Sequence, residues 1–178
     1  AFLVEGQMDF LMVWQSGIRT DVATSGTALG LEHLKNMKRV ADTLVISFDK
    51  DEAGLKALER ALDLMGSHDF NIKVVDLGPY KDPAEAAEKE PNYLETALAR
   101  ATPALTYVFD HHLKKAGNRL SEPAQFKSTL RPLLSKIKNL ISPLDQAFWL
   151  KELATKSGVD EKVLLLELGR IAIPKTYT

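Results

Sequence analysis

The 178-residue chain contains no cysteine and no long apolar run. Without cysteine it has no disulfide, no thiolate zinc ligand and no cysteine nucleophile, and a cytoplasmic location is allowed. The longest uninterrupted apolar run is the five residues from Phe10 to Trp14, which is too short for a membrane span or a signal peptide. With 45% apolar residues, the chain can fill one large core or two small ones. We therefore expect a soluble, cytoplasmic protein.

A strong net charge is missing as well, since 23 basic and 24 acidic residues sum to −1. That balance lacks the basic excess typical of nucleic-acid-binding proteins. The distribution is uneven, however: residues 1–100 hold 11 Lys and Arg against 17 Asp and Glu, and the remainder holds 12 against 7. The two parts carry −6 and +5. We predict one domain over residues 1–100 and another over 101–178, although scattered surface charge would explain the same counts.

Short apolar runs alternate with helical spacing through residues 1–100. The alternation predicts an α/β fold with an open, mainly parallel sheet flanked by helices. The run from Leu44 to Ile46 is continuously apolar, as expected of a strand covered on both faces. The predicted strands cover residues 1–4, 21–24, 43–48 and 71–77, and the predicted helices cover residues 8–15, 31–41 and 55–65.

Strand-like runs disappear after the Glu-rich segment 85–95, and only helical periodicity continues. We predict an all-α subdomain there, with helices over 105–113 and 126–140 and two more after residue 142. Ser142 followed by Pro143 is typical of a helix start, and Asp160 is the predicted cap of the last helix. Pro132 should kink or break the second helix, because proline removes a backbone hydrogen bond.

Acidic residues follow two predicted strands, at the end where open α/β sheets bind ligands. Glu5 directly follows the first strand, and Asp49 and Asp51 follow the third. Residues two apart in an extended chain point to the same side, so Asp49 and Asp51 can converge on one cation. Carboxylates gathered in one place repel each other unless a cation neutralises them, and Mg²⁺ prefers such oxygen ligands. We predict a magnesium site at these three residues.

Two further acids extend this prediction, and some acids have simpler explanations. Asp82, in the run Lys81-Asp82-Pro83, is a candidate ligand for a second metal, and Asp9 is a candidate supporting ligand. Asp51 also stands where a helix N-cap belongs, and Asp9 would favour a helix dipole without any metal. Spacing alone leaves both interpretations open.

The turn after the second predicted strand offers hydroxyls and backbone N–H groups to a phosphate. It contains Ser25, Gly26 and Thr27, and glycine-bearing turns of this kind bind anions. An ordinary polar turn is the alternative. Neither GxxxxGK[ST] nor GxGxxG occurs in the chain, so a P-loop NTPase or a dinucleotide-binding domain gains no support.

Four motifs together resemble the Toprim domain of bacterial replicative DNA primases of the DnaG type, in order and spacing as well as in content. The Glu-Gly and Asp-x-Asp motifs occur in Toprim proteins generally, whereas the other two indicate the primase branch. The motifs are Val4-Glu5-Gly6 with Asp9, Ser25 to Leu29 with Glu32 to Lys35, Phe48 to Gly54, and Lys81-Asp82-Pro83.

The resemblance implies that Glu5, Asp49 and Asp51 bind catalytic Mg²⁺ or Mn²⁺, with Asp9 and Asp82 in support. The reaction would be attack of a ribonucleotide 3′-hydroxyl on the α-phosphate of an incoming NTP, releasing pyrophosphate. The expected substrate-binding residues are Ser25, Gly26, Thr27 and Lys50.

Two departures from the family pattern stand out in the chain. Lys50 replaces the glycine that the family commonly has between the two aspartates. Gly78-Pro79-Tyr80 replaces Pro-Asp-Gly, so one acid is lost. Lys50 would contact a triphosphate or lower metal occupancy, and the lost acid removes one candidate ligand of a second metal.

The same resemblance implies the binding partners of the protein and further domains outside this chain. Single-stranded DNA would be the template and ribonucleoside triphosphates the substrates of a monomeric protein at the replication fork in the nucleoid, with no membrane contact. The chain looks cut from something longer, because Ala1 enters a strand directly. We expect a cysteine-rich zinc module upstream and a helicase-binding domain downstream, and we expect the fragment alone to be inactive in priming.

Two other functions remain open at this point. One is a Toprim nuclease or topoisomerase, although Tyr80, Tyr93, Tyr107 and Tyr177 lack the context of a topoisomerase nucleophile. The other is a non-catalytic Toprim scaffold that docks through basic helices. The lysines in question are Lys114, Lys115, Lys136 and Lys138, which would equally suit a solvated surface.

Overall fold

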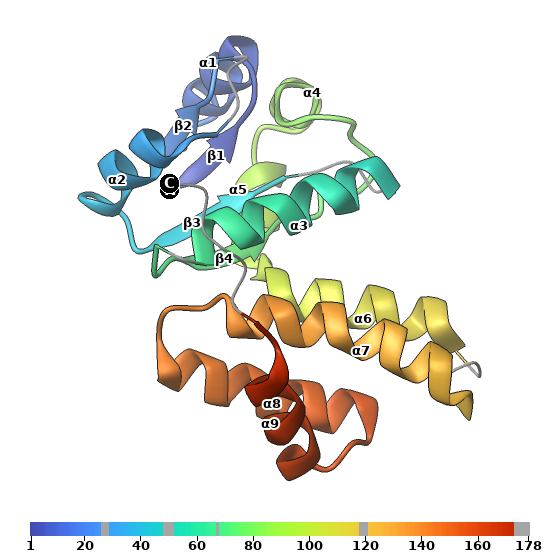
Figure 1. The fold of residues 1–178 in the computed structure, drawn as a ribbon. Coiled ribbons are helices and arrows are strands. Elements are labelled where there is room, and N and C mark those ends of the chain that lie inside the picture. Colours follow the sequence, from blue (N-terminus) through green and yellow to red (C-terminus); the bar gives the residue numbers. More distant parts are fainter. Residues whose placement is uncertain (26–28, 48–51, 67, 118–120, 173–178) are drawn as a thin grey trace. The chain divides into compact units, whose positions relative to one another are not determined.

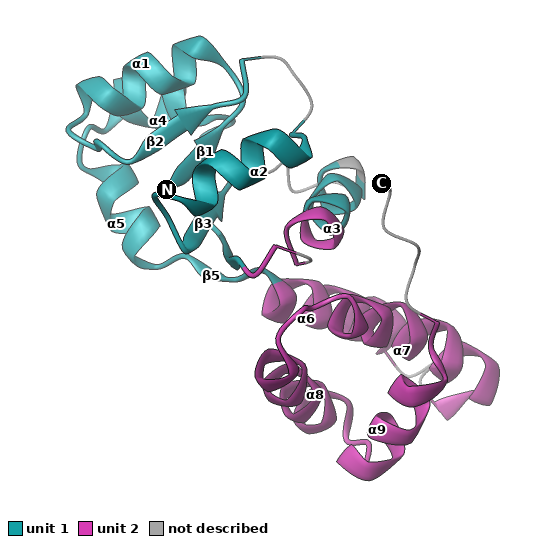
Figure 2. Cartoon of the chain, turned by 60° about the vertical axis from the view of Figure 1, so that its left-hand side comes forward, with its two compact units in different colours: residues 1–61, 70–104 teal, residues 62–69, 105–178 magenta. Residues whose placement is uncertain are grey.

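The computed structural model describes residues 1–25, 29–47, 52–66, 68–117 and 121–172. The chain divides into two compact units, coloured separately in Figure 2. Unit 1 comprises residues 1–61 and 70–104, and unit 2 comprises residues 62–69 and 105–178. No helix in the described ranges is long and apolar enough to cross a membrane.

Unit 1 is built on a sheet with the strand order β2-β1-β3-β4-β5 (Figure 1). The first four strands pair in parallel, with Phe2 of β1 opposite Asp21 of β2 on one side and Val45 of β3 on the other. This confirms the predicted α/β class with a mainly parallel sheet. The strands are β1 (Phe2–Val4), β2 (Asp21–Ala23), β3 (Thr43–Ile46), β4 (Asn71–Val74) and β5 (Thr102–Pro103).

Helices cover both faces of this sheet (Figures 1 and 2). Side chains alternate between faces along a strand, and Phe2 and Val4 of β1 share one face. There they join Val13 in a core formed with α1 (Gln7–Gln15), α4 (Pro83–Lys89) and α5 (Tyr93–Ala99). The opposite face carries α2 (Leu31–Lys38) and α3 (Glu52–Gly66), whose Leu34 and Leu58 are almost completely buried.

The sequence-based prediction that no strand follows the Glu-rich segment is wrong. The Glu-rich segment forms α4 and α5, and a short strand follows it, although no strand was expected there. Thr102 and Pro103 of β5 pair antiparallel with Val74 and Lys73 of β4. Two residues are too few to show any periodicity. Proline, which has no N–H to donate, is tolerated at the edge of a sheet.

Unit 2 is helical, as predicted. Its helices are α6 (Ala104–Ala116, whose first residue belongs to unit 1), α7 (Pro123–Lys138), α8 (Pro143–Ser157) and α9 (Glu161–Arg170), and the end of α3, residues 62–66, also belongs to it. Both predicted caps are confirmed: the Ser142 hydroxyl accepts the N–H of Asp145 at 3.2 Å, and Asp160 accepts the N–H of Lys162 at 2.8 Å. Such caps satisfy N–H groups that the first helical turn leaves without partners.

Pro132 was expected to kink or break its helix, and the structure shows that it does not break it. The helix α7 continues without interruption from Pro123 to Lys138. Pro132 itself is exposed, whereas Leu133, Leu134 and Ile137 in the next turn are buried. Tertiary packing of this apolar side stabilises the helix beyond the lost hydrogen bond.

Asp21 is a buried carboxyl group in β2, with an exposed fraction of only 6%. Among the described residues, neither of its carboxylate oxygens has a hydrogen-bond partner. Burial raises the pKa of Asp21 above its usual value of 3.8, against smaller opposite effects of its own backbone N–H and of Arg19. Since the native state then binds a proton more readily than the unfolded chain does, this residue lowers stability as pH rises from about 4 through the raised pKa.

We predict that Asp21→Val, which is close to aspartate in volume, raises the free energy of unfolding by about 1–2 kcal/mol at pH 7. The gain should be smaller at pH 4, because the raised pKa keeps more of the native aspartate protonated there than at pH 7. Urea unfolding of both proteins at the two pH values measures the difference. A gain that is equal at both pH values would contradict the titration, and a loss would show that Asp21 has a stabilising partner.

Candidate metal centre

The carboxyl ends of four parallel strands meet at one edge of the sheet in unit 1. Glu5 follows β1, Thr24 follows β2, Ser47 follows β3, and Asp76 lies two residues beyond β4. The Glu5 side chain is exposed there. Asp49, Lys50 and Asp51 of the predicted site lie outside the described residues, as do Gly26 and Thr27. The structure therefore places Glu5 at the edge where a ligand site was predicted.

The backbone around Glu5 is held from two sides. Thr24 donates its backbone N–H to the Val4 carbonyl at 3.1 Å and its hydroxyl to the Glu5 carbonyl at 3.3 Å. On the other side, the Gly6 N–H donates to Asp9 Oδ2 at 3.2 Å. A Cβ atom at position 6 would also lie 3.2 Å from this oxygen, so glycine permits the close approach. These contacts fix the backbone that carries the Glu5 side chain.

Asp9 joins two segments that are far apart in the sequence. Its Oδ1 accepts the backbone N–H of Ala84 at 3.2 Å, while its Oδ2 accepts that of Gly6. Asp9 lies in the first turn of α1, and Ala84 lies in the first turn of α4. Both carboxylate oxygens therefore accept N–H groups at helix N-termini, where negative charge is favourable.

Asp82, the predicted ligand of a second metal, is the N-cap of α4. Its Oδ1 accepts the N–H of Glu85 at 2.7 Å, and its Oδ2 lies 3.5 Å from the ammonium group of Lys81. Glu85 in turn accepts the backbone N–H of Lys81 at 2.8 Å. This hydrogen bond, followed by the one from Lys89, lowers the pKa of Glu85. The loop that carries Asp82 is thus tied to the first turn of its own helix.

The Ser25 backbone has a left-handed conformation, with φ of +53°. Its side chain is exposed directly after Thr24. A left-handed residue bends the chain sharply and is uncommon for any residue except glycine, asparagine and aspartate. The predicted phosphate-binding turn therefore begins with an unusual backbone conformation at the same edge of the sheet as Glu5.

Two tyrosines pack against each other at the loop Gly78-Pro79-Tyr80, where the chain departs from the Pro-Asp-Gly pattern. The ring of Tyr80 meets that of Tyr93 edge to face at 4.8 Å, and its hydroxyl donates to Glu90 at 3.0 Å. This hydrogen bond is the main cause that raises the pKa of Tyr80. Gly78, with φ of +60°, lies against the Tyr93 hydroxyl. The substituted sequence thus forms a structured loop held by aromatic packing.

Two residues at this edge were not singled out by sequence reasoning. Asp76 follows the end of β4 and accepts the N–H of Gly78 at 2.7 Å. Thr24 was predicted only as the last residue of the second strand, whereas the structure gives it two hydrogen bonds beside Glu5. Thr24 and Asp76 lay inside the predicted strands 21–24 and 71–77, and only the shorter strands of the structure place them at the carboxyl edge of the sheet.

A family model described as Toprim-like matches residues 2–87. The DNA primase of Borreliella burgdorferi is 31% identical over 170 residues, which are 95% of this chain and 32% of that protein. A DNA primase domain from Pseudomonas aeruginosa has a TM-score of 0.79 at 24% identity, over 96% of this chain and 54% of that one. A DnaG primase catalytic domain bound to single-stranded DNA has a TM-score of 0.74 at 24% identity, over 91% and 52%.

Residues 2–87 are thus similar to the Toprim-like family, and most of the chain is similar to DNA primases of the DnaG type. This confirms the resemblance found in the four motifs. The chain spans only 24% to 32% of the length of the first three relatives, all DNA primases.

Toprim primases in general depend on divalent metals. Within the described residues, no three His, Asp or Glu side chains are grouped closely enough to hold an ion. Glu5 is the one member of the predicted triad that these residues include. Its exposed carboxylate offers the hard oxygen ligand that Mg²⁺ or Mn²⁺ prefers.

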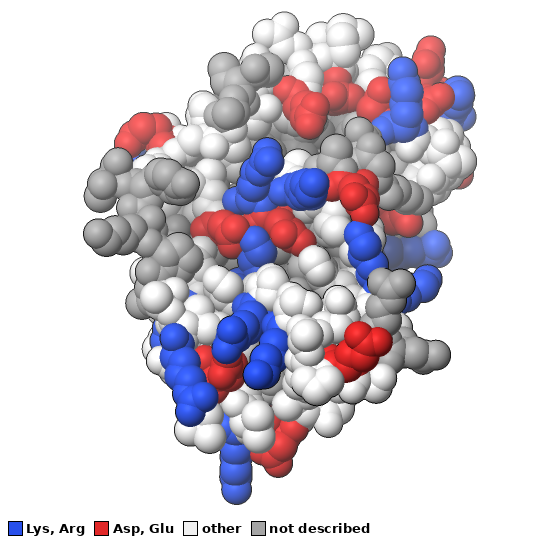
Figure 3. All heavy atoms as spheres, turned by 45° about the vertical axis from the view of Figure 1, so that its right-hand side comes forward, with Lys and Arg blue, Asp and Glu red and all other residues white. Residues whose placement is uncertain are grey.

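Basic and acidic side chains are interspersed on the face shown in Figure 3. Two lysines of unit 2 lie beside acids. Lys136 pairs with Asp63 at 2.6 Å, and Lys156 pairs with Asp110 at 2.6 Å. Such pairing reduces the positive field that a basic docking surface would present to a nucleic acid.

Proposed function

We propose that this chain is the metal-binding part of a DNA primase, which synthesises short RNA primers on single-stranded DNA by divalent-metal-dependent nucleotidyl transfer. The observation that carries the proposal is the exposed carboxylate of Glu5 at the carboxyl end of β1, in a Toprim domain related to DNA primases. We assign the catalytic role to residues 1–100 and a supporting role to the helices of residues 101–178.

Glu5, Asp49 and Asp51 are the proposed ligands of Mg²⁺ or Mn²⁺. The strands β1 and β3 are neighbours in the sheet, so Glu5 follows the strand next to the one that precedes both aspartates. Asp82 is the proposed contributor to a second ion. A divalent ion bound there would activate the attacking hydroxyl and neutralise charge on the reacting phosphate.

The chain's own residues hold and orient the substrates in this proposal. The hydrogen bonds of Thr24 fix the Glu5 backbone, so the carboxylate needs little reorganisation before it binds an ion. Ser25, Gly26 and Thr27 offer hydroxyls and N–H groups to a triphosphate. The Lys50 ammonium group offers a positive charge that compensates the phosphate oxygens.

The template and the remaining partners follow from the related proteins. A DnaG catalytic domain of the same fold binds single-stranded DNA, and we propose that the longer protein containing this chain does the same. Ribonucleoside triphosphates would be its substrates, and the replicative helicase would bind a part outside this chain. We propose that the protein acts as a monomer at the replication fork in the cytoplasm.

The metal site is tested by titrating this chain with Mn²⁺ in a calorimeter. Asp49→Asn should weaken Mn²⁺ binding by about tenfold or more, because it removes both a charge and an oxygen ligand. The matched control is Asp42→Asn, since Asp42 directly precedes β3 at its opposite end and is exposed beside Lys38. Unchanged affinity in Asp49→Asn, or an equal loss in Asp42→Asn, would refute the proposed site.

A further inference from the structure

Asp9 lies at a helix N-terminus, as its helix-dipole interpretation predicts, but its contacts extend beyond its own helix. Its two carboxylate oxygens each accept one backbone N–H at 3.2 Å, from Gly6 and from Ala84. The first donor lies three residues away in the chain and the second lies 75 residues away. Asp9 is therefore a link between two segments that the sequence keeps far apart.

Each of these segments carries a proposed metal ligand. Gly6 directly follows Glu5, and Ala84 lies two residues after Asp82, the N-cap of α4. Asp82 is itself held in place by the N–H of Glu85 at 2.7 Å. A shift of Asp9 would consequently move the backbone next to Glu5 and the backbone next to Asp82 together.

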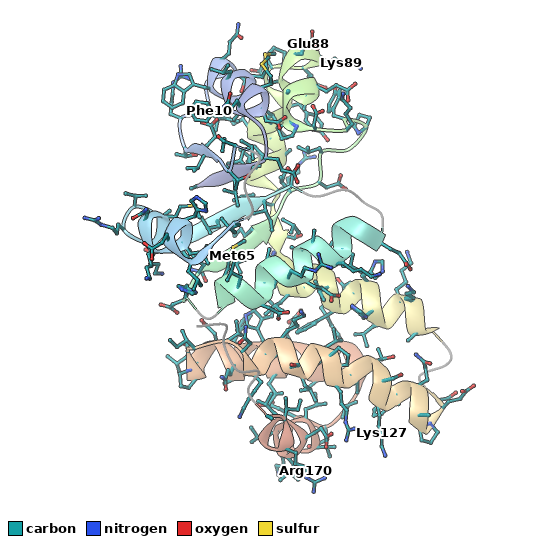
Figure 4. The ribbon with its side chains drawn as sticks, turned by 45° about the horizontal axis from the view of Figure 1, so that its top comes forward. Phe10, Met65, Glu88, Lys89, Lys127 and Arg170 are labelled. Carbon is teal, nitrogen blue, oxygen red and sulfur yellow. The ribbon has the colours of Figure 1, made fainter. Side chains whose placement is uncertain are left out.

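Packing between the two helices makes this link rigid. The helices α1 and α4 are neighbours in unit 1, and Figure 4 shows α1, labelled at Phe10, beside α4, labelled at Glu88 and Lys89. Val13 of α1 and Ala86 of α4 are completely buried in one core. Well-packed cores transmit small displacements instead of absorbing them.

We propose that Asp9 is a positioning residue, which aligns the Glu5 and Asp82 segments and influences metal binding through Glu5. The inference rests on the proposed function and changes the role of Asp9 within it. Each carboxylate oxygen of Asp9 accepts a hydrogen bond from one backbone N–H group, at the start of α1 and of α4. Both helix N-termini therefore stabilise the negative charge of the carboxylate. Residues that orient metal ligands typically change metal affinity without touching the ion.

A double-mutant cycle on the 178-residue chain separates positioning from ligation. Mn²⁺ affinity is measured for the parent chain, Glu5→Gln, Asp9→Asn and the double variant, with thermal unfolding as the check on folding. Asp9→Asn should weaken binding by roughly tenfold. In the Glu5→Gln background it should have almost no further effect, because residues that act through one another are not additive.

Additive losses in the cycle would overturn the inference, since they would mean that Asp9 influences metal binding independently of Glu5. Unchanged affinity in Asp9→Asn would overturn it as well. Unchanged affinity in Glu5→Gln would instead refute the proposed metal site, so the two failures are distinguishable.

A second measurement needs no variant of Asp9. When the parent chain is titrated with Mg²⁺, the ¹³C signal of the Glu5 carboxylate should move while that of Asp9 stays in place. Equal movement of both signals would assign Asp9 to the metal and overturn the inference, even if Asp9→Asn fails to fold.

Discussion

Glu5→Gln in the longer protein that contains this chain should reduce RNA primer synthesis on single-stranded DNA by about a thousandfold or more, a barrier increase of about 4 kcal/mol. Glutamine keeps the size of the side chain but removes the negative charge that holds a divalent ion. The Glu5 backbone should stay in place, since Thr24 and Asp9 hold it through backbone groups. The loss should therefore appear in catalysis without loss of folding.

The measurement is incorporation of labelled ribonucleotides into primers, with Asp42→Asn as the matched control. Full activity in Glu5→Gln would remove Glu5 from the mechanism. Cleavage of DNA by the parent protein in the absence of NTPs would favour a Toprim nuclease instead. Loss of template binding with metal affinity unchanged would favour a docking role.

Phe109→Ala should lower the free energy of unfolding of unit 2 by about 3–5 kcal/mol, the usual cost of truncating a fully buried phenylalanine. Phe109 is completely buried in α6 and meets the ring of Trp149 in α8 edge to face at 6.1 Å. The substitution removes this contact and leaves a cavity between the two helices.

Phe148→Ala is the matched control for this prediction. Phe148 also contacts Trp149 edge to face, at 5.1 Å, but it is 62% exposed. Its truncation should cost less than about 1 kcal/mol, as is usual for surface positions. Urea unfolding is followed by Trp149 fluorescence in proteins that carry Trp14→Phe, because the chain has only two tryptophans. Equal losses in the two variants would contradict the described packing of unit 2.

The elements that sequence could predict are those with a repeated local signal. Four short runs predicted β1, β2, β3 and β4 to within a few residues at their ends, because buried parallel strands need consecutive apolar side chains. The caps at Ser142 and Asp160 were predictable for the same reason, since capping depends on residues only two or three positions apart. Fold class and these helix starts therefore follow from local physical chemistry.

The elements that sequence could not predict depend on contacts between distant residues. Two residues of β5 carry no period, and their pairing with β4 exists only in the folded chain. The continuity of α7 through Pro132 depends on the burial of Leu133 and Ile137, which outweighs the local penalty. The buried position of Asp21 is a third example, because a polar residue in a short run gives no sign of being covered.

At the candidate site, too, some features have a local sequence signal and others depend on contacts between distant residues. The position of Glu5 at the carboxyl edge of the sheet was predictable, because it directly follows an apolar strand. The link from Asp9 to Ala84 was not, since it joins residues 75 positions apart. A carboxylate that binds metal and one that binds backbone N–H groups look the same in a sequence, and only the placement of their neighbours distinguishes them.

The central claim is that a divalent ion binds between the ends of β1 and β3. Anomalous diffraction from crystals of the chain grown with Mn²⁺ tests it most directly, because the anomalous signal locates the ion itself. We predict a Mn²⁺ peak coordinated by carboxylate oxygens of Glu5, Asp49 and Asp51. A peak coordinated by other residues, or no peak at this edge of the sheet at saturating Mn²⁺, would contradict the account.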